Sequence, residues 1–300
     1  MKKFFNLALI FAAMLSIGSC KSETAENRIA MHTLIQIRAE GFNSKSAVEE
    51  SFNRIAELEK IFEEDLNRIE SNPDKFVEIH SETLELLEES QKISLETQGS
   101  WDITIGSALK IWDFDQAKIP SEDQISQAKN LVDFKNLTLD KKNQRAKISR
   151  AGVKLDFGGI AKGFAADEVR KSFDQYKIRS GLIQIGASTI CAVGKKSDGS
   201  KWKIGLKNPR DTSKILRTIE LEDQTISTSG DYEKFFILEG IRYHHILDPK
   251  TCAPVQNGIA SVSVIVPNSM SHAGLISDAY STASFVNKKK VFETIVIEGS

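Results

Sequence analysis

One stretch, residues 154–170, constrains this chain more than any other, because it reads as a short strand, a glycine turn and a helix in direct succession. The adjacent Gly158 and Gly159 permit a tight turn and let a ligand approach bare backbone. The helix is expected to begin near Ala161, where its free N–H groups attract an anion, and Lys162 adds a positive charge. The stretch suits a phosphate or pyrophosphate, although an ordinary strand-to-helix connection has the same pattern.

The charge balance of the chain argues against a nucleic-acid-binding protein. Its 300 residues include 40 Lys and Arg and 41 Asp and Glu, which leaves a formal net charge of −1. Nucleic-acid binders usually carry a basic excess. The length allows one large domain or two modest ones, each with an ample core.

The N-terminal segment has the pattern of an export signal. Lys2 and Lys3 precede an apolar run over 4–17 that is too short to span a bilayer comfortably, and small residues then lead to Cys20. The run Ile-Gly-Ser-Cys at 17–20 resembles the bacterial lipoprotein signal. That resemblance implies a signal peptide over 1–19, a lipidated Cys20 followed by a polar tether over 20–28, and anchoring on the periplasmic or other extracytoplasmic face of a bacterial cell membrane. The alternatives are an uncleaved anchor and a plain secretory signal.

The order of the expected elements favours an α+β fold. A strand is expected over 29–38, apolar residues recur at helical spacing over 48–62, and a second helix is expected over 81–99. Strands dominate after residue 180, with a helix candidate over 272–285. A helix-rich part followed by a strand-rich part with inserted helices indicates α+β. Cys191 and Cys252 are compatible with a disulfide but do not establish one, and the lack of CxxC and HExxH patterns argues against zinc.

The segment 277–282 places a carboxylate and a hydroxyl one helical turn apart. Asp278 and Thr282 stand at positions i and i+4, so they share one face of the expected helix. Oxygen donors of this kind suit Mg²⁺ rather than zinc. A capping aspartate at a helix N-terminus is the alternative interpretation of Asp278.

Three further features carry chemistry but have plainer interpretations. His245 precedes Asp248 in an Asp-Pro turn, where a histidine near an aspartate can be a general base or a phosphate ligand. A strand-end histidine and a turn aspartate give the same pattern, and the Thr-Ser-Gly-Asp-Tyr run at 228–232 is likewise an ordinary turn composition. Trp101 and Trp112 are expected in the core or as a wall for a flat aromatic ligand.

Taken together, these segments resemble the ApbE family of flavin transferases, the FAD:protein FMN transferases. Residues 156–167 match the family's Asp-x-Gly-Gly-Ile-Ala-Lys-Gly-Tyr-Ala-x-Asp except for Phe164, and 228–232 match Thr-Ser-Gly-Asp-Tyr. Residues 243–254 match Tyr-x-His-Ile-Ile/Leu-Asp-Pro-x-Thr-Gly-x-Pro except for Cys252, and 278–283 match Asp-Ala-x-x-Thr-Ala. The motifs stand in the family's order, and the resemblance runs from about residue 29 to residue 285.

The resemblance implies a domain over 29–300 with an ApbE-like, T-fold-related architecture, in which mixed sheets with flanking helices form a cleft for FAD. The implied ligands of Mg²⁺ are Asp278, Thr282 and the backbone carbonyl of Ala161. The implied catalytic residue is His245, aligned by Asp248. Contacts to FAD are implied for Met31, Asp102, Asp156, Gly158, Gly159, Lys162, Asp167, Ser229, Gly230 and Asp231.

The implied reaction transfers FMN from FAD to a Ser or Thr hydroxyl of an exported redox protein and releases AMP. Lys162 and Mg²⁺ neutralise the pyrophosphate in this scheme, and His245 assists proton transfer. The same site could pass FMN to water, as an FAD pyrophosphatase, or bind flavin without catalysis. The chain departs from the family at His32, Ser188 and Glu70, where glycine, asparagine and asparagine are usual. These departures bear on FAD affinity more than on the metal site.

Overall fold

The computed structural model of the protein describes residues 22–299. The predicted signal peptide and the predicted lipidation site at Cys20 lie outside the described residues. Within that range no helix is both long enough and apolar enough to span a bilayer.

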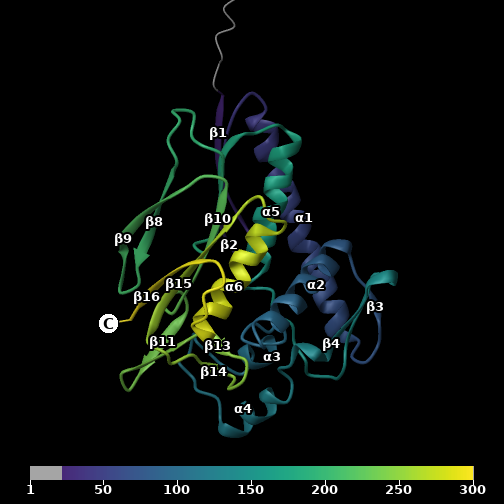
Figure 1. Ribbon diagram of the computed structural model, residues 1–300. Coiled ribbons are helices and arrows are strands. Elements are labelled where there is room, and N and C mark those ends of the chain that lie inside the picture. Colours follow the sequence, from purple (N-terminus) through teal and green to yellow (C-terminus); the bar gives the residue numbers. More distant parts are fainter. Residues whose placement is uncertain (1–21, 300) are drawn as a thin grey trace, which may run out of the picture.

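A seven-stranded sheet forms the centre of the molecule, with the spatial order β1-β2-β6-β7-β10-β15-β16 (Figure 1). Every neighbouring pair in it is antiparallel. Its strands are β1 (Glu23–Ala30), β2 (Thr33–Glu40), β6 (Ser180–Ile185), β7 (Thr189–Val193), β10 (Gln224–Gly230), β15 (Ile259–Pro267) and β16 (Glu293–Glu298). The β-branched strand β15 is buried over all but its last residue, because both faces of the sheet are covered.

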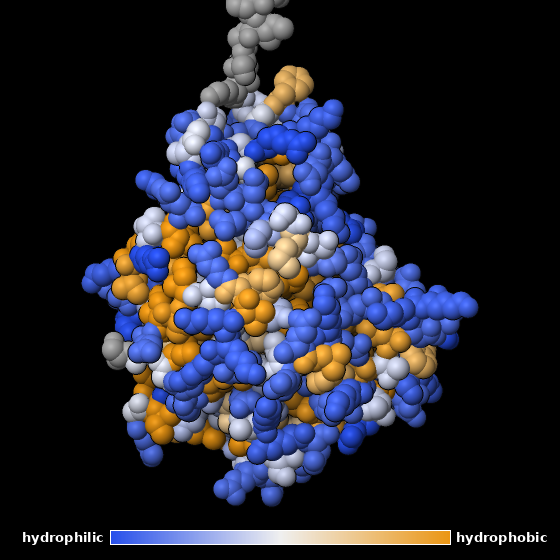
Figure 2. Space-filling view, viewed as in Figure 1, coloured by the Kyte–Doolittle hydropathy of each residue, from blue (hydrophilic) through white to orange (hydrophobic). Residues whose placement is uncertain are grey.

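A two-stranded hairpin covers one face of this sheet. It consists of β8 (Trp202–Asn208) and β9 (Asp211–Leu221). Alternate residues of β8, namely Trp202, Ile204 and Leu206, pack on Ala192 and Ile226 of the sheet. Hydrophobic residues also reach the surface on this side of the molecule, at the left of Figure 2.

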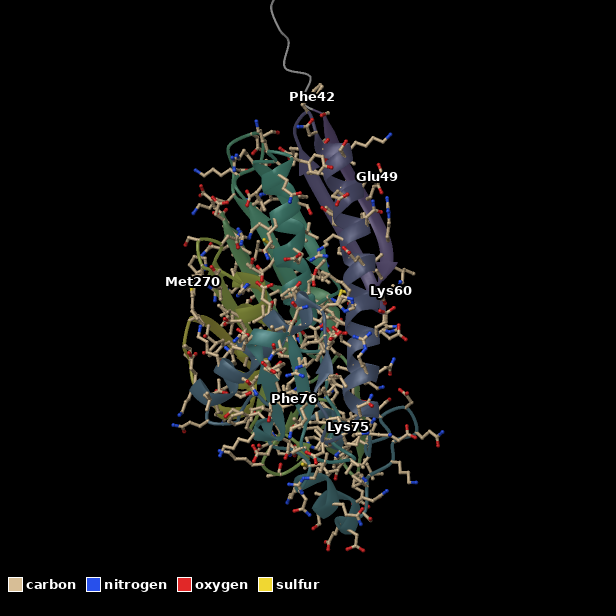
Figure 3. All side chains as sticks on the ribbon, turned by 90° about the vertical axis from the view of Figure 1, so that its right-hand side faces the viewer. Phe42, Glu49, Lys60, Lys75, Phe76 and Met270 are labelled. Carbon is tan, nitrogen blue, oxygen red and sulfur yellow. The ribbon has the colours of Figure 1, made fainter. Side chains whose placement is uncertain are left out.

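Three helices, α1 (Ser44–Ser71), α5 (Ala161–Gln175) and α6 (Ala273–Asn287), cover the opposite face. The apolar stripe of α1, with Ile55 and Leu58, is fully buried in the main core together with Phe164 of α5. The charged side chains of Glu49 and Lys60 point away from the sheet (Figure 3). Amphipathic burial therefore holds α1 as an outer layer of the fold.

Smaller elements surround the lower end of the sheet in Figure 1. They are α2 (Ser81–Glu96), a three-stranded sheet of β3 (Val77–Glu78), β5 (Arg145–Ile148) and β4 (Leu137–Asp140), the short helices α3 (Gly106–Leu109) and α4 (Glu122–Lys129), and the hairpins β11 (Phe235–Leu238) with β12 (Ile241–His244) and β13 (Leu247–Asp248) with β14 (Ala253–Pro254). A second apolar cluster, with Trp112, Phe114 and Phe236, joins the hairpins to the loop after α3. The predicted α+β class is confirmed.

The tether expected over 20–28 needs correction, because residues from Glu23 onward form strand β1. This strand pairs with β2 from Glu23 opposite Glu40 to Ala30 opposite Thr33. It is the edge strand of the sheet, and several of its side chains face solvent. Edge strands in soluble proteins are often polar, so the composition that suggested a tether fits a strand as well.

The two cysteines inside the described range are both buried and both free. Cys191 lies in β7, whereas Cys252 lies in the turn between β13 and β14. The backbone of Cys252 has a φ of 55°, in the left-handed region. The glycine that the family has at this position would adopt that conformation without strain.

Candidate active site

The motif segments of the sequence converge on one cleft with a volume of about 700 Å³. Its walls come from the β1–β2 turn, the loop around Trp101, the glycine turn, the β6–β7 turn, the end of β10, the segment around His245, and α6. The predicted site residues that line it are Met31, Asp102, Asp156, Gly158, Gly159, Lys162, Ser229, Gly230, His245, Asp278 and Thr282. Segments about 250 residues apart in the chain therefore share one cavity.

The floor of the cleft rests on the crossing of α5 and α6, where two glycines touch. A Cβ added to Gly163 would lie 2.1 Å from the carbonyl oxygen of Gly274, and one added to Gly274 would lie 2.3 Å from that of Gly163. Only bare backbone permits this approach. The crossing brings α6 close enough for Asp278 Oδ2 to accept a hydrogen bond from the Gly163 N–H at 3.1 Å.

Asp278 is buried, yet its carboxylate can still accept further hydrogen bonds or bind a cation. Its side chain is 3% exposed, and burial raises the pKa of its carboxyl group, while the charge of Lys162 acts in the opposite direction. Thr282 lies one turn further along the same helix, as predicted, and its hydroxyl is 3.0 Å from the Ser229 hydroxyl. One carboxylate and two hydroxyls therefore meet at the cleft floor.

These oxygen atoms suit a hard cation that also binds phosphate oxygens of a ligand. No cluster of three or more His, Cys, Asp or Glu residues that could hold a metal occurs between residues 22 and 299. Mg²⁺ commonly takes one or two carboxylates and completes its shell with water and phosphate oxygens. Ala161 begins α5 and is buried beside this floor, but it is not among the cleft-lining residues. The role of its carbonyl stays a prediction.

The glycine turn supplies bare backbone and a cation, as the sequence indicated. A Cβ on Gly159 would lie 3.0 Å from the Trp101 ring and 3.3 Å from the Thr282 hydroxyl, so a side chain there would fill the space between them. Lys162 Nζ donates a hydrogen bond to the Gly158 carbonyl. Lys162 forms no ion pair with any carboxylate of the described chain, so its charge is available to an anion.

Asp156 directly precedes this turn, and Asp102 stands in the neighbouring loop, where the Ile103 carbonyl accepts a hydrogen bond from the Asp156 N–H at 2.8 Å. Asp156 is half-buried and accepts a hydrogen bond from the Gly158 N–H at 3.3 Å. Asp102 accepts from the Thr104 N–H and hydroxyl at 2.8 and 2.6 Å and from the Phe134 N–H at 2.8 Å. Burial raises the pKa of both carboxyl groups. The hydrogen bonds of Asp102 mainly stabilise its own loop. The carboxylate of Asp156 accepts fewer hydrogen bonds and can therefore accept more from a ligand.

Glu70 binds the segment that leads into the glycine turn. The family usually has asparagine at this position. Glu70 accepts from the Lys154 ammonium at 2.7 Å and from the Leu155 N–H at 2.9 Å. A carboxylate pairs with this lysine better than an amide would. The departure at Glu70 therefore fixes the strand that leads into the turn.

Aromatic side chains form one wall of the cleft. Both tryptophans are buried, as the core interpretation predicts, and their contact with a flat aromatic ligand stays a prediction. Trp101 is 4% exposed and donates its indole N–H to the Ser90 hydroxyl at 2.9 Å. Trp112 donates to the Cys252 carbonyl at 2.9 Å and stacks on Phe114 with ring centroids 5.9 Å apart. The three rings also line the cleft. Such a wall accommodates a flat aromatic ligand.

His245 lies at the cleft, whereas its neighbour His244 is buried behind it. His245 Nδ1 is 3.3 Å from the Lys234 carbonyl, and burial lowers the pKa of the imidazole. A neutral ring that donates from Nδ1 leaves Nε2 as an acceptor. No residue between 22 and 299 hydrogen-bonds to Nε2, so His245 can accept a proton from a ligand.

Besides Ala161, three predicted site residues of the described chain do not line the cleft. Asp248 accepts from the Lys250 N–H at 2.9 Å and closes its own turn, and no hydrogen bond within the described residues joins it to the His245 ring. Asp231 forms a bidentate pair with Arg210, with contacts of 2.8 and 3.0 Å. The carboxylates of these two residues are engaged inside the scaffold, and their roles toward FAD and His245 stay predictions.

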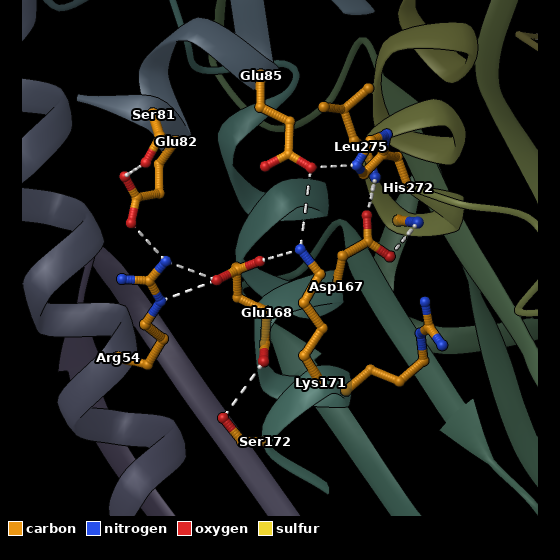
Figure 4. A network of polar contacts seen from close by, with 12 residues as sticks. Arg54, Ser81, Glu82, Glu85, Asp167, Glu168, Lys171, Ser172, His272 and Leu275 are labelled. Carbon is orange, nitrogen blue, oxygen red and sulfur yellow. Dashed lines mark hydrogen bonds and ion pairs between the residues drawn. The ribbon is translucent and has the colours of Figure 1, made fainter. Parts of the chain in front are cut away.

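Asp167 is the third residue that lies outside the cleft lining. Its two carboxylate oxygens accept from the N–H groups of Gly274 and Leu275, both at 2.9 Å. It therefore caps the N-terminus of α6, and its contact with FAD stays a prediction. A charged network continues from here to α1 and α2 (Figure 4). In it, Arg54 donates to Glu168 at 2.8 Å, and His272 Nε2 lies 2.5 Å from Glu85.

Local sequence patterns do not identify several residues that line the cleft, or the left-handed backbone that the β1–β2 turn requires. Ser100, Glu233 and Lys234 line the cleft but stand in loops without a recognisable pattern. His32 also lines it, with a φ of 57° in the tight β1–β2 turn. A glycine at position 32, usual in the family, would reach this conformation more easily. The glycine that the family usually has at this position is therefore the sequence feature that indicates the unusual backbone of the turn.

Known proteins share both sequence and fold with this chain. The model of the ApbE family matches residues 31–297. The FAD:protein FMN transferase of Haemophilus influenzae is 29% identical, with 92% of this chain and 86% of that protein covered. The corresponding protein of Treponema pallidum is 27% identical, with 94% and 85% covered.

Solved structures agree with this result. The ApbE protein of Thermotoga maritima superimposes with a TM-score of 0.80 at 29% identity, covering 90% of this chain and 88% of its own. The Pseudomonas stutzeri flavinyl transferase ApbE, in its apo form, gives a TM-score of 0.76 at 27% identity, covering 89% and 85%. The predicted ApbE-like architecture is confirmed, and the chain belongs to the ApbE family.

Proposed function

We propose that this protein transfers FMN from FAD to a Ser or Thr hydroxyl of an acceptor protein and releases AMP, in a Mg²⁺-dependent reaction. The observation that carries the proposal is the convergence of Lys162, the Asp278–Thr282 pair and His245 on one cleft. These groups are a cation, a set of hard oxygen donors and a neutral base. Phosphoryl transfer needs the same three functions.

The cleft suits two parts of FAD, one aromatic ring system and the pyrophosphate. The aromatic wall of Trp101, Trp112 and Phe114 can contact a flat ring system. The free backbone of Gly158 and Gly159 at the start of α5 accommodates phosphates, and Lys162 supplies a positive charge. FAD carries an aromatic ring system at each end and a pyrophosphate between them, so it matches this arrangement.

Asp278 and Thr282 would hold the Mg²⁺ ion. When bound, Mg²⁺ offsets negative charge on the pyrophosphate. In the transfer, the acceptor oxygen forms a bond to the FMN-side phosphorus, and the bond from that phosphorus to the bridging oxygen breaks. AMP departs with the bridging oxygen. His245 Nε2 takes the proton that the acceptor hydroxyl loses, because the lowered pKa keeps the imidazole neutral before the reaction.

One assay tests the proposed activity. The protein is incubated with FAD, Mg²⁺ and a threonine-bearing acceptor domain, and protein-bound flavin fluorescence is measured on a denaturing gel. Labelled acceptor supports transfer, and chelation of Mg²⁺ should abolish the label. Free FMN and AMP without label would instead identify an FAD pyrophosphatase. Absence of all three products would overturn both enzymatic proposals and leave flavin binding alone.

We also propose that Cys20 is lipidated and holds the protein on the extracytoplasmic face of the bacterial membrane. The support is the sequence pattern that ends at Cys20. Because β1 begins at Glu23, the folded domain would then lie close to the membrane surface. Cell fractionation of the wild type and of Cys20→Ser tests this: the wild type should be recovered with membranes and the variant should not. Equal distribution would contradict the proposal.

A further inference from the structure

A second groove, with a volume of about 470 Å³, adjoins the cleft. It lies between β8 and the face of the central sheet that the β8–β9 hairpin covers, with Leu182, Ile190 and Ile226 on its floor. The groove and the cleft share five wall residues: Thr33, Gly186, Ala187, Ser188 and Thr228. A chain that lies in the groove can therefore reach the cleft across the β6–β7 turn.

One side of this groove is an unpaired strand edge. Within the described residues, β8 pairs with β9 alone. Five consecutive residues of β8, 203–207, line the groove. A strand face contributes every second residue to a cavity, so a consecutive run means that the cavity follows the edge. Such an edge offers free N–H and C=O groups to an added strand.

The same edge carries two cations. Lys203 and Lys207 line the groove, are exposed, and form no ion pair with any described carboxylate. They stand four residues apart on β8, which corresponds to about 13 Å along an extended strand. An extended segment that pairs with this edge would therefore be favoured if it carried acidic side chains.

The junction between the two cavities offers polar groups. The Ser188 hydroxyl is buried there and has no hydrogen-bond partner within the described chain. The Thr228 hydroxyl lies 2.7 Å from that of Ser263 on the groove floor. A buried hydroxyl without a partner is costly, and a polar group of a bound segment would satisfy it.

We infer that this groove is the docking site of the acceptor protein, which adds an extended, acidic segment to the free edge of β8 and presents its hydroxyl residue at the β6–β7 turn. The inference rests on the proposed transfer function. It assigns the two substrates to different cavities: FAD to the cleft between the sheet and α6, and the acceptor segment to the groove beside β8. The acceptor hydroxyl reaches the cleft past Ser188.

The test reverses the charge of the groove and measures the two substrates separately. In Lys203→Glu/Lys207→Glu, the KM for the acceptor domain should rise at least about tenfold, as expected when two attractive charges become repulsive. FAD affinity and the slow release of FMN and AMP without acceptor should stay unchanged. The matched control is Lys214→Glu, which changes an exposed lysine of β9 that lies outside the groove, and it should leave the KM unaltered. An unchanged KM in the double variant, or weakened FAD binding, would overturn the inference.

A second measurement does not depend on turnover. A photo-crosslinking residue at position 207 should capture the acceptor domain, whereas one at position 214 should not. If the wild type transfers no flavin but position 207 still captures the acceptor, the proposed function fails and the docking site stands. If transfer occurs and both positions fail to capture the acceptor, the docking site is wrong and the function stands. Capture of a second copy of this chain instead of the acceptor would also contradict the inference.

Discussion

Helices α5 and α6 contain the same glycine–aspartate spacing, but their two carboxylates end in different environments. Gly163 precedes Asp167 by four residues, and Gly274 precedes Asp278 by four. Each aspartate accepts a hydrogen bond from the glycine N–H of the other helix. Asp167 accepts a second one from Leu275 and is enclosed by the scaffold, whereas Asp278 accepts only one from the part of the chain that the structure describes and lines the cleft.

This difference separates a structural carboxylate from a functional one. Both groups are buried, and burial raises the pKa of both. What distinguishes Asp278 is unused acceptor capacity that faces an open cavity, next to the hydroxyl of Thr282. An acceptor that folding leaves unsatisfied at a cavity wall is available to a cation. Four predictions test whether the two carboxylates differ in this way.

The largest effect is expected for Asp278→Asn. The amide keeps an acceptor for the Gly163 N–H but loses the charge that a cation needs, so transfer should fall by about a thousandfold. The thermal unfolding midpoint should stay near that of the wild type. Transfer rates and thermal melts of the purified variant measure both. Normal transfer would remove Asp278 from the metal site.

Gly163→Ala should disrupt the crossing itself. Its methyl group would lie 2.1 Å from the Gly274 carbonyl oxygen, so α5 and α6 must separate. We expect a loss of unfolding free energy of about 3 kcal/mol, at the upper end of overpacking effects. Denaturant unfolding measures it. Gln175→Ala changes an exposed position of the same helix, away from this contact, and serves for comparison. A stable Gly163→Ala protein would show that the crossing tolerates a side chain.

Asp167→Asn should have the opposite profile to Asp278→Asn. The amide offers one acceptor to two N–H groups, which leaves a buried donor of α6 unsatisfied and costs about 1–3 kcal/mol. Transfer per folded molecule should change less than in Asp278→Asn. Parallel melts and rate measurements on the two variants compare them directly. If Asp167→Asn lowered transfer more than Asp278→Asn did, and lowered stability less, then Asp167 would be the functional carboxylate and Asp278 the structural one.

The smallest effect concerns pH and His272, which precedes α6. A hydrogen bond with Glu85 raises the pKa of His272 and lowers that of Glu85. Because the folded-state pKa of His272 exceeds its unfolded value, the pair stabilises the fold fully below the unfolded pKa. That stabilisation is lost as pH rises through the folded pKa.

His272→Asn should therefore lower stability on the order of 1 kcal/mol near pH 6, and by less at pH 9. Asparagine tolerates the left-handed backbone at this position, where φ is 57°. Thermal melts of both proteins across this pH range check the trend. Glu89 and Asp167 also raise the pKa of His272, so Glu85→Gln should reproduce only part of the effect. A stability difference that grows with pH would contradict the account.

Local patterns in the sequence predicted the parts of the site that depend on neighbouring residues. The glycine turn, the helix start at Ala161 and the shared helix face of Asp278 and Thr282 each follow from residues within a few positions of one another. The sequence pattern therefore located the cleft floor correctly.

Residues whose partners are distant in sequence could not be assigned in the same way. Asp231 and Asp167 belong to motifs, but their environments depend on Arg210 in the loop between β8 and β9 and on the N-terminus of α6. The Gly163–Gly274 contact joins two separate helices and leaves no signal in either alone. Strand β1 was likewise missed because its polar composition fits both an edge strand and a tether.

The effect of Mg²⁺ on FAD affinity is the most direct test of the proposed metal site. If Asp278 and Thr282 hold the ion against the phosphates, Mg²⁺ should tighten FAD binding to the wild type by about tenfold or more, which corresponds to roughly 1.4 kcal/mol. Asp278→Asn should bind FAD with one affinity whether Mg²⁺ or a chelator is present. Fluorescence titration of FAD measures both. A wild type that is indifferent to Mg²⁺, or a variant that still responds to it, would contradict the account.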